Sequence, residues 1–281
     1  MLIDIKTYDG YIIKGRISLP EGDGEISKLV IYIPGAAYGV YATYNGGFSE
    51  TFFTDKGIAY FTFNKRGLYV TNEPPFYTVD SEEFKTYFPS NSIIDIYEMI
   101  KELRLIKRLA KCKILLNGWS EGAQIAPLFA LKYPGIADAL FLCGYPNDNL
   151  KDLQKHLWAK IKGGSKAYEN VLSAVERKDS EWLKRNNGPP LEWLLDHYNL
   201  KSNNDLLPTL DLPIYIFHGE LDEPCDIKGV YKIRDVFNQL GKSNLAVHVF
   251  ENHDHNLDVN DSSESTLSKG KKAFLDAVYN F

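Results

Sequence analysis

The 281-residue chain lacks long apolar runs, a basic stripe and closely paired cysteines. No segment stays apolar over the roughly 20 residues that a membrane-spanning helix needs, so we expect no membrane partner. Its 37 acidic residues outnumber its 32 lysines and arginines, and the basic residues form no stripe that could neutralise phosphates. This distribution argues against a nucleic-acid partner. Residues 1–15 alternate polar and apolar side chains without the apolar core of a secretory signal, so we expect a cytoplasmic protein.

Cysteine is scarce, with Cys112, Cys143 and Cys225 each standing alone in the sequence. Zinc sites and redox motifs need closely spaced pairs, so we predict buried thiols in a reducing compartment, with no metal and no cofactor. Cys225 lies beside Glu223 and Asp226, and neighbouring carboxylates raise a thiol pKa. We therefore do not expect Cys225 to be a nucleophile.

The sequence does have a globular composition, 44% hydrophobic and 25% charged. Short runs of β-branched and aromatic residues recur at 29–33, 58–63, 113–116, 139–143, 213–217 and 245–250. Helical patterns lie between or after them, at 92–109, 121–132 and 266–279. This alternation predicts a mainly parallel sheet covered by helices. The Asp9-Gly10 turn, between runs at 2–7 and 11–19, predicts an antiparallel hairpin at the sheet edge.

The alternation stops after Pro146, and the sequence up to about Leu207 is helical, charged and rich in aromatic residues. We predict a helical cap at 147–207 and a core made of 1–146 and 208–281. The cap tryptophans either contact a substrate or pack the cap helices together. Residues 71–90 contain three prolines and show no clear period, so we predict a long loop there.

The pentapeptide Gly118-Trp119-Ser120-Glu121-Gly122 fits the G-x-S-x-G pattern. The pattern alone is weak, but here it follows an apolar strand and precedes a helical run, which is the context that a nucleophilic serine requires. The flanking glycines allow strand and helix to approach closely. We predict that Ser120 is the nucleophile.

A serine nucleophile needs a base and an acid that orients the base. The turn after the strand at 213–217 supplies Asp222, which we choose as the acid, with Glu220, Glu223 and Asp148 as alternatives. The loop after the last strand supplies His253 and His255 as possible bases. The resulting order of serine, acid and histidine is that of one known class of serine hydrolases.

Over nearly its whole length the chain resembles the α/β-hydrolase superfamily, on three motifs: the pentapeptide at Ser120, the His218-Gly219-Glu220-Leu221-Asp222 turn and the Asp254-His255 pair. The resemblance implies an α/β-hydrolase fold with a mainly parallel eight-stranded sheet and a helical cap after strand 6. It also favours His255 over His253 as the base and gives His218 a structural role. The sequence places no recognisable constellation of catalytic residues around His156, His197 or His248.

The oxyanion of the tetrahedral intermediate needs backbone N–H donors. We expect one from Glu121, directly after the nucleophile, and one from Ala36 in the loop after the strand at 29–33, with Ala37 as reserve. Asn64-Lys65-Arg66-Gly67 resembles the superfamily's D-x-R-G turn, in which Arg66 is expected to be a structural ion-pair partner. The substrate contacts that we expect are Ala37, Tyr38, Tyr77, Trp119, Trp158 and Trp193.

The function predicted from these features is hydrolysis of a small carboxylic ester through an acyl-enzyme, with Ser120, His255 and Asp222 as the catalytic triad. A serine peptidase or amidase, or a thioesterase, could use the same residues. A protein of another class, a ligand-binding module without catalysis, also remains open because a fold does not fix a function. The complete set of three residues favours catalysis.

Overall fold

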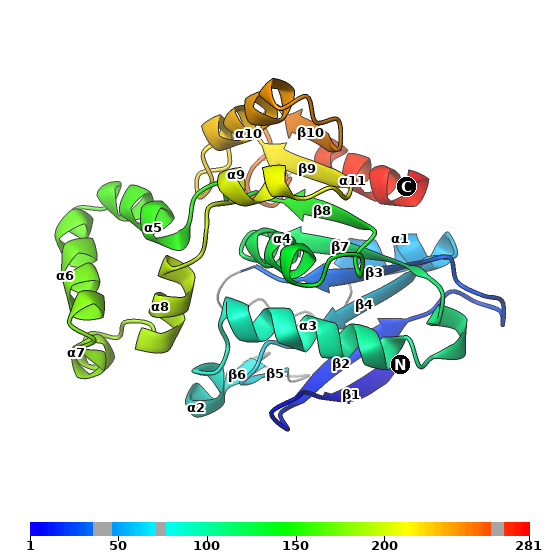
Figure 1. Ribbon diagram of the computed structural model, residues 1–281, viewed down its shortest axis with the longest axis horizontal. Coiled ribbons are helices and arrows are strands. Elements are labelled where there is room, and N and C mark those ends of the chain that lie inside the picture. Colours follow the sequence, from blue (N-terminus) through cyan, green and yellow to red (C-terminus); the bar gives the residue numbers. More distant parts are fainter. Residues whose placement is uncertain (36–46, 71–76, 260–266) are drawn as a thin grey trace.

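Eight strands form one sheet in the computed structural model, which describes residues 1–35, 47–70, 77–259 and 267–281 (Figure 1). The strands are β1 (Leu2–Lys6), β2 (Ile12–Ser18), β3 (Lys28–Ile33), β4 (Ala59–Phe63), β7 (Lys113–Trp119), β8 (Ala139–Cys143), β9 (Ile214–Gly219) and β10 (Leu245–Phe250). Their spatial order is β1-β2-β4-β3-β7-β8-β9-β10. The pairs β1–β2 and β2–β4 are antiparallel and the other pairs are parallel. The predicted sheet and its edge hairpin are confirmed.

The central strands are buried because helices cover both faces of the sheet, and every residue of β4 and β8 is buried. The helices are α1 (Gly47–Asp55), α3 (Pro89–Leu103), α4 (Gly122–Lys132), α10 (Ile227–Gln239) and α11 (Lys269–Asn280). Side chains of α3, α4 and α10 join the larger apolar cluster on one face. Those of α1 and α11 join the cluster on the other face. The loops that carry the candidate site follow the carboxyl ends of the parallel strands, between these two helical layers.

A helical segment joins β8, the sixth strand of the sheet, to β9, the seventh. Its helices are α5 (Leu150–Ala159), α6 (Gly164–Glu176), α7 (Ser180–Arg185), α8 (Leu191–Tyr198) and α9 (Asn203–Leu206). In Figure 1, α5 to α8 extend away from the sheet, while α9 lies close to it. Residues of α6, α7 and α8 form an apolar cluster of their own.

The prediction of a loop at 71–90 was wrong for the part that the structure describes. A short strand, β6 (Tyr77–Val79), pairs with β5 (Leu68–Val70) in a separate two-stranded sheet, and the one-turn helix α2 (Ser81–Phe84) follows it. Asp80 starts α2 by accepting hydrogen bonds from two backbone N–H groups. Pro89 occupies the first turn of α3, where its missing N–H costs nothing. These two residues are helix starts rather than loop signals.

None of the helices in the described ranges combines the length and the apolar character needed to cross a membrane.

Candidate active site

The turn between β7 and α4 holds Ser120 in a strained conformation, with a φ of +53°. Its glycines are required by close packing. A Cβ added to Gly122 would lie 2.0 Å from the carbonyl oxygen of Ile33, and one added to Gly118 would lie 2.3 Å from that of Gly122. Strand β3 and the turn therefore touch backbone to backbone. The turn sets Ser120, partly exposed, at the carboxyl end of the parallel strands.

Asp222 and His255 meet at the same edge of the sheet. Nδ1 of His255 lies 2.9 and 2.8 Å from the two carboxylate oxygens of Asp222. The Asp222 side chain is fully buried and also accepts the backbone N–H of Cys225 at 2.8 Å, while the His255 side chain is 20% exposed. Because a carboxylate only accepts, Nδ1 carries the proton and Nε2 of a neutral His255 can accept one.

Gly144, directly after β8, connects this pair to the serine turn. The backbone N–H of Ser120 donates to the carbonyl oxygen of Cys143 at 2.9 Å. A Cβ on Gly144 would lie 2.8 Å from Cε1 of His255. The imidazole therefore packs on the backbone directly after β8, the strand next to the one that presents Ser120.

The alternatives to Asp222 and His255 have other surroundings. His253 is buried, and its Nδ1 contacts the carbonyl oxygen of Glu251 at 2.7 Å while its Nε2 accepts the backbone N–H of Gly270 at 3.2 Å. Both of its ring nitrogens are thus used in local structure. Glu220 and Glu223 are exposed.

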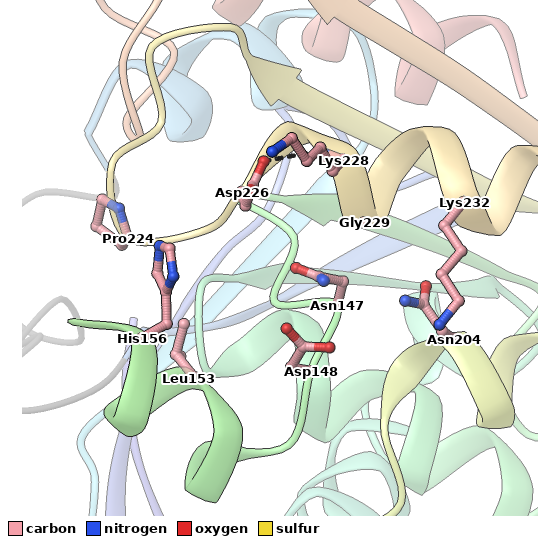
Figure 2. A pocket seen from close by; sticks show the side chains of 10 residues that line it. All are labelled: Asn147, Asp148, Leu153, His156, Asn204, Pro224, Asp226, Lys228, Gly229 and Lys232. Carbon is pink, nitrogen blue, oxygen red and sulfur yellow. Dashed lines mark hydrogen bonds between the residues drawn. The ribbon is translucent and has the colours of Figure 1, made fainter. Parts of the chain in front are cut away.

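Asp148, the remaining alternative acid, lines a cavity of about 230 Å³ beside α5, α9 and the start of α10. Figure 2 shows the cavity with the side chains around it. They are Asn147, Asp148, Leu153, His156, Asn204, Pro224, Asp226, Lys228, Gly229 and Lys232. Burial raises the pKa of the Asp148 carboxyl, and neighbouring Asp152 adds to this shift.

His218 has the structural role expected of it. Its Nε2 contacts the carbonyl oxygen of Cys225 at 2.9 Å, so the ring proton is on Nε2. Burial lowers the pKa of His218 and favours the neutral ring. Nδ1 then has no proton to donate to Asp222, whose carboxylate lies 3.7 Å away.

Asp222, Cys225 and His255 are a possible metal-ligand group, because their donor atoms all lie within 4.8 Å of one another. A cysteine binds metal as the thiolate. Burial raises the pKa of the Cys225 thiol well above its usual range, and the charge of Asp222 raises it further. The group is therefore better described as a carboxylate–imidazole pair beside a neutral thiol. All three cysteines are buried and free, as expected.

Glu121 has a role that sequence reasoning missed. Only its backbone N–H was expected to matter, yet its buried carboxylate contacts Lys65 Nζ at 2.9 Å, Tyr87 Oη at 2.6 Å and His197 Nε2 at 2.9 Å. The expectation that His197 has no constellation around it was wrong. The partners come from three distant parts of the chain, so no local motif reveals them.

Arg66 is the structural ion-pair partner that was predicted. Its buried guanidinium pairs with Asp95 at 2.6 Å and with Asp9 at 2.6 Å.

The remaining predicted residues divide into two groups. Ala36, Ala37, Tyr38 and the side chain of Tyr77 lie outside the described part of the chain. The three predicted tryptophans are partly buried in aromatic packing: Trp119 against Phe274, Trp158 against Tyr168 and Trp193 against the ring of His197. Their contact with a substrate stays a prediction.

Comparison with known proteins gives matches by structure alone. No family model and no curated protein sequence matches the chain. The acylaminoacyl peptidase of Pyrococcus horikoshii matches with a TM-score of 0.65 at 16% identity, over 99% of this chain and 39% of that one. This chain thus spans about two fifths of that peptidase. Est1E of Butyrivibrio proteoclasticus matches with a TM-score of 0.64 at 13% identity, over 100% of this chain and 96% of Est1E.

A Xanthomonas campestris protein, described as an α/β serine hydrolase without lid, matches with a TM-score of 0.52 at 12% identity, over 92% of this chain and 86% of that one. At identities this low, structural similarity shows the fold and does not show the activity. Together with the strand order and the serine turn between β7 and α4, these likenesses establish that the chain has the α/β-hydrolase fold.

Proposed function

We propose that the protein is a serine hydrolase that cleaves a carboxylic ester of a small molecule through an acyl-enzyme. The observation that supports this most is the pair of hydrogen bonds between His255 Nδ1 and Asp222, at the sheet edge where Ser120 is held with a positive φ. A serine hydroxyl is a weak nucleophile until a positioned base removes its proton. An oriented imidazole beside such a serine is the arrangement that this chemistry needs.

In the proposed reaction, Nε2 of His255 takes the proton of Ser120 as Oγ attacks the ester carbonyl. The backbone N–H groups of Glu121 and Ala36 donate to the resulting oxyanion. His255 then protonates the leaving alcohol, and the acyl group stays on Ser120. A water molecule, deprotonated by His255, attacks the acyl-enzyme, and as the second intermediate collapses and releases the acid, His255 returns the proton to Oγ of Ser120. Asp222 remains ionised and stabilises the imidazolium in both steps.

Residues 147–207 act, in this proposal, as a cap over the site, with 1–146 and 208–281 as the catalytic core. Support comes from the position of the helices between β8 and β9, the strands whose following loops include Gly144 and Asp222. A cap of this kind excludes water and contacts the acyl or alcohol part of the substrate. Trp158 and Trp193 are the cap residues that we propose for such contacts.

The test is labelling with a fluorophosphonate probe, followed by location of the adduct by mass spectrometry. We expect an adduct on Ser120 in the wild type and none in Ser120→Ala. Turnover of matched p-nitrophenyl esters, anilides and thioesters then separates an esterase from an amidase or a thioesterase. A folded wild type that neither reacts with the probe nor cleaves any of these substrates would contradict the proposal and favour a ligand-binding protein.

A further inference from the structure

Three polar side chains surround the carboxylate of Glu121 in the interior of the protein. The side chains of Lys65, Glu121 and His197 are exposed by only 1%, 6% and 1%, and Tyr87 is buried as well. Lys65 follows β4, Tyr87 precedes α3 and His197 lies on α8 of the helical segment. A buried carboxylate is costly unless charges and hydrogen bonds compensate it, and here it has both.

Both ring nitrogens of His197 have partners in this cluster. His197 Nδ1 lies 2.8 Å from the carbonyl oxygen of Trp193, and its Nε2 lies 2.9 Å from Oε1 of Glu121. Both partners, a carbonyl oxygen and a carboxylate oxygen, are hydrogen-bond acceptors. His197 therefore bridges the backbone of α8 and the carboxylate of Glu121 through its two ring nitrogens.

The partners of Glu121 favour its ionised form. Burial would raise the pKa of Glu121, but the charge of Lys65 and the hydrogen bonds from His197 and Tyr87 hold this pKa well below its usual range. The cluster thus pairs an ionised carboxylate with the amino group of Lys65, whose pKa burial lowers against the opposing effect of Glu121.

The cluster contacts the chain on both sides of the nucleophile. Glu121 directly follows Ser120, and its backbone N–H is the oxyanion donor in the proposed reaction. Lys65 Nζ also donates to the carbonyl oxygen of Gly35, which follows β3. Gly35 in turn packs on the serine, because a Cβ added there would lie 3.0 Å from Cβ of Ser120. One lysine therefore links Gly35 to the residue after Ser120.

We propose that Lys65, His197 and the carboxylate of Glu121 form a positioning unit, which fixes the serine turn and with it the backbone donor for the oxyanion. This inference rests on the proposed function. It gives the helical segment a part in the chemical step, because α8 contributes His197. A fixed turn keeps the backbone donor in place as charge develops, and a preorganised donor acts mainly on kcat.

The experiment compares Glu121→Gln, His197→Leu and His197→Gln with the wild type, using p-nitrophenyl acetate turnover and the rate of fluorophosphonate labelling. We expect Glu121→Gln and His197→Leu to lower kcat by about tenfold or more, with KM changed by less than about twofold. His197→Gln keeps a donor toward Glu121 and should recover part of the loss. Each assay is run well below the Tm of the variant.

Asp95→Asn is the matched control, because it breaks the buried ion pair to Arg66, the residue next to Lys65. It should lower the Tm and leave kcat unchanged. Tyr87→Phe removes one hydrogen bond to Glu121 with little change in shape, so it tests the inference if larger substitutions unfold the chain, and it should lower kcat by a few-fold.

Wild-type kcat and labelling rates in folded Glu121→Gln, His197→Leu and Tyr87→Phe would overturn the inference while leaving the proposed function intact. An equal loss of kcat in Asp95→Asn would overturn it too, because the effect would then follow stability alone. A wild type that is neither labelled nor active would overturn the proposed function, and the inference with it.

Discussion

His253 and His255 are two residues apart, yet their hydrogen bonds give them different chemistry. His253 uses both ring nitrogens in local backbone contacts, with Nδ1 as donor and Nε2 as acceptor. His255 uses Nδ1 toward Asp222 and keeps Nε2 for a proton. A general base needs a nitrogen that can accept a proton in the reaction, and the contacts of His255 satisfy this need.

Replacing each histidine by glutamine separates the two roles. His255→Gln should slow fluorophosphonate labelling of Ser120 by about 10²- to 10⁴-fold, because the general base is lost. His253→Gln should leave the labelling rate unchanged and reduce the free energy of unfolding by about 1–3 kcal/mol, because a buried polar group loses a partner. Labelling rates and urea unfolding of both variants measure the two effects. Slow labelling in folded His253→Gln alone would reverse the assignment.

Gly122 allows a second prediction about a single residue. A Cβ at this position would lie 2.0 Å from the carbonyl oxygen of Ile33, far inside contact distance. Gly122→Ala should therefore displace the serine turn from β3, lowering the Tm and slowing the labelling of Ser120. Gly135→Ala is a suitable comparison, because a Cβ there has no neighbour within 4 Å although the φ of +79° adds strain. It should lower the Tm without slowing the labelling, and slowing equal to that of Gly122→Ala would contradict the packing argument.

Local motifs in the sequence predicted which candidate site residues would lie close together. Ser120, Asp222 and His255 each follow a strand, and strands in a parallel sheet end at one edge, so their proximity could be predicted. The cluster around Glu121 could not, because Lys65, Tyr87 and His197 meet only through folding of the whole chain. The one sequence signal for this cluster was Lys65 in the turn at 64–67. From the sequence, a role was assigned only to its neighbour in that turn, Arg66.

At the scale of elements, the edge hairpin β1–β2 is tied to the core through Arg66. The guanidinium pairs with Asp95 on α3 and with Asp9 in the hairpin turn, and it lies 5.0 Å from the ring centre of Tyr11. The hydrogen bond from Arg66 lowers the pKa of Asp9 from 3.8 to about 2, against a smaller opposing effect of burial. The folded state thus favours the ionised Asp9.

This shift predicts how stability depends on pH. Because the pKa of Asp9 is lower in the folded state, its contribution is fully present above pH 3.8 and is lost as the pH falls through about 2. Asp9→Asn should therefore reduce stability at neutral pH, and the deficit should shrink between about pH 4 and pH 2. The side chain is 35% exposed, so solvent screening limits the effect to about 1 kcal/mol or less.

Chemical denaturation at a series of pH values measures this difference. Asp4→Asn provides the control, since Asp4 forms an exposed pair with Lys14 at 3.6 Å in the same hairpin and should contribute little. A deficit of Asp9→Asn that stays constant down to about pH 2 would show that the carboxylate charge is not its cause.

Elements could be predicted from the sequence where periodicity was long or hydrophobicity was continuous, as in β8 and β10, whose bounds agree with the predicted runs. The short elements at 77–84 could not, because each depends on a partner or on one capping residue. Asp80 caps α2, and β6 exists through its pairing with β5. The prolines at 74, 75 and 89 were all interpreted as loop residues, so the helix start at Pro89 was missed.

On the scale of the whole molecule, polar contacts join α8 of the helical segment to the sheet region. Asp196 on α8 accepts the backbone N–H of Ser90 at 2.9 Å, and its neighbour His197 contacts Glu121. The apolar cluster of α6, α7 and α8 is separate from the two clusters that flank the sheet. A small separate cluster can open without exposing the main core.

Hydrogen exchange should therefore divide the molecule into two parts. We expect backbone amides of α6 and α7 to exchange at least about tenfold faster than those of β7 and β8, whose opening requires loss of the core. Amides of α8 should be intermediate in the wild type, because Asp196 and His197 hold this helix. In His197→Leu they should approach the rates of α6, while the rates of β7 and β8 stay unchanged. Equal protection across all of these elements would mean that the helical segment and the sheet unfold as one cooperative unit, and the link through His197 would then have no separate effect on opening.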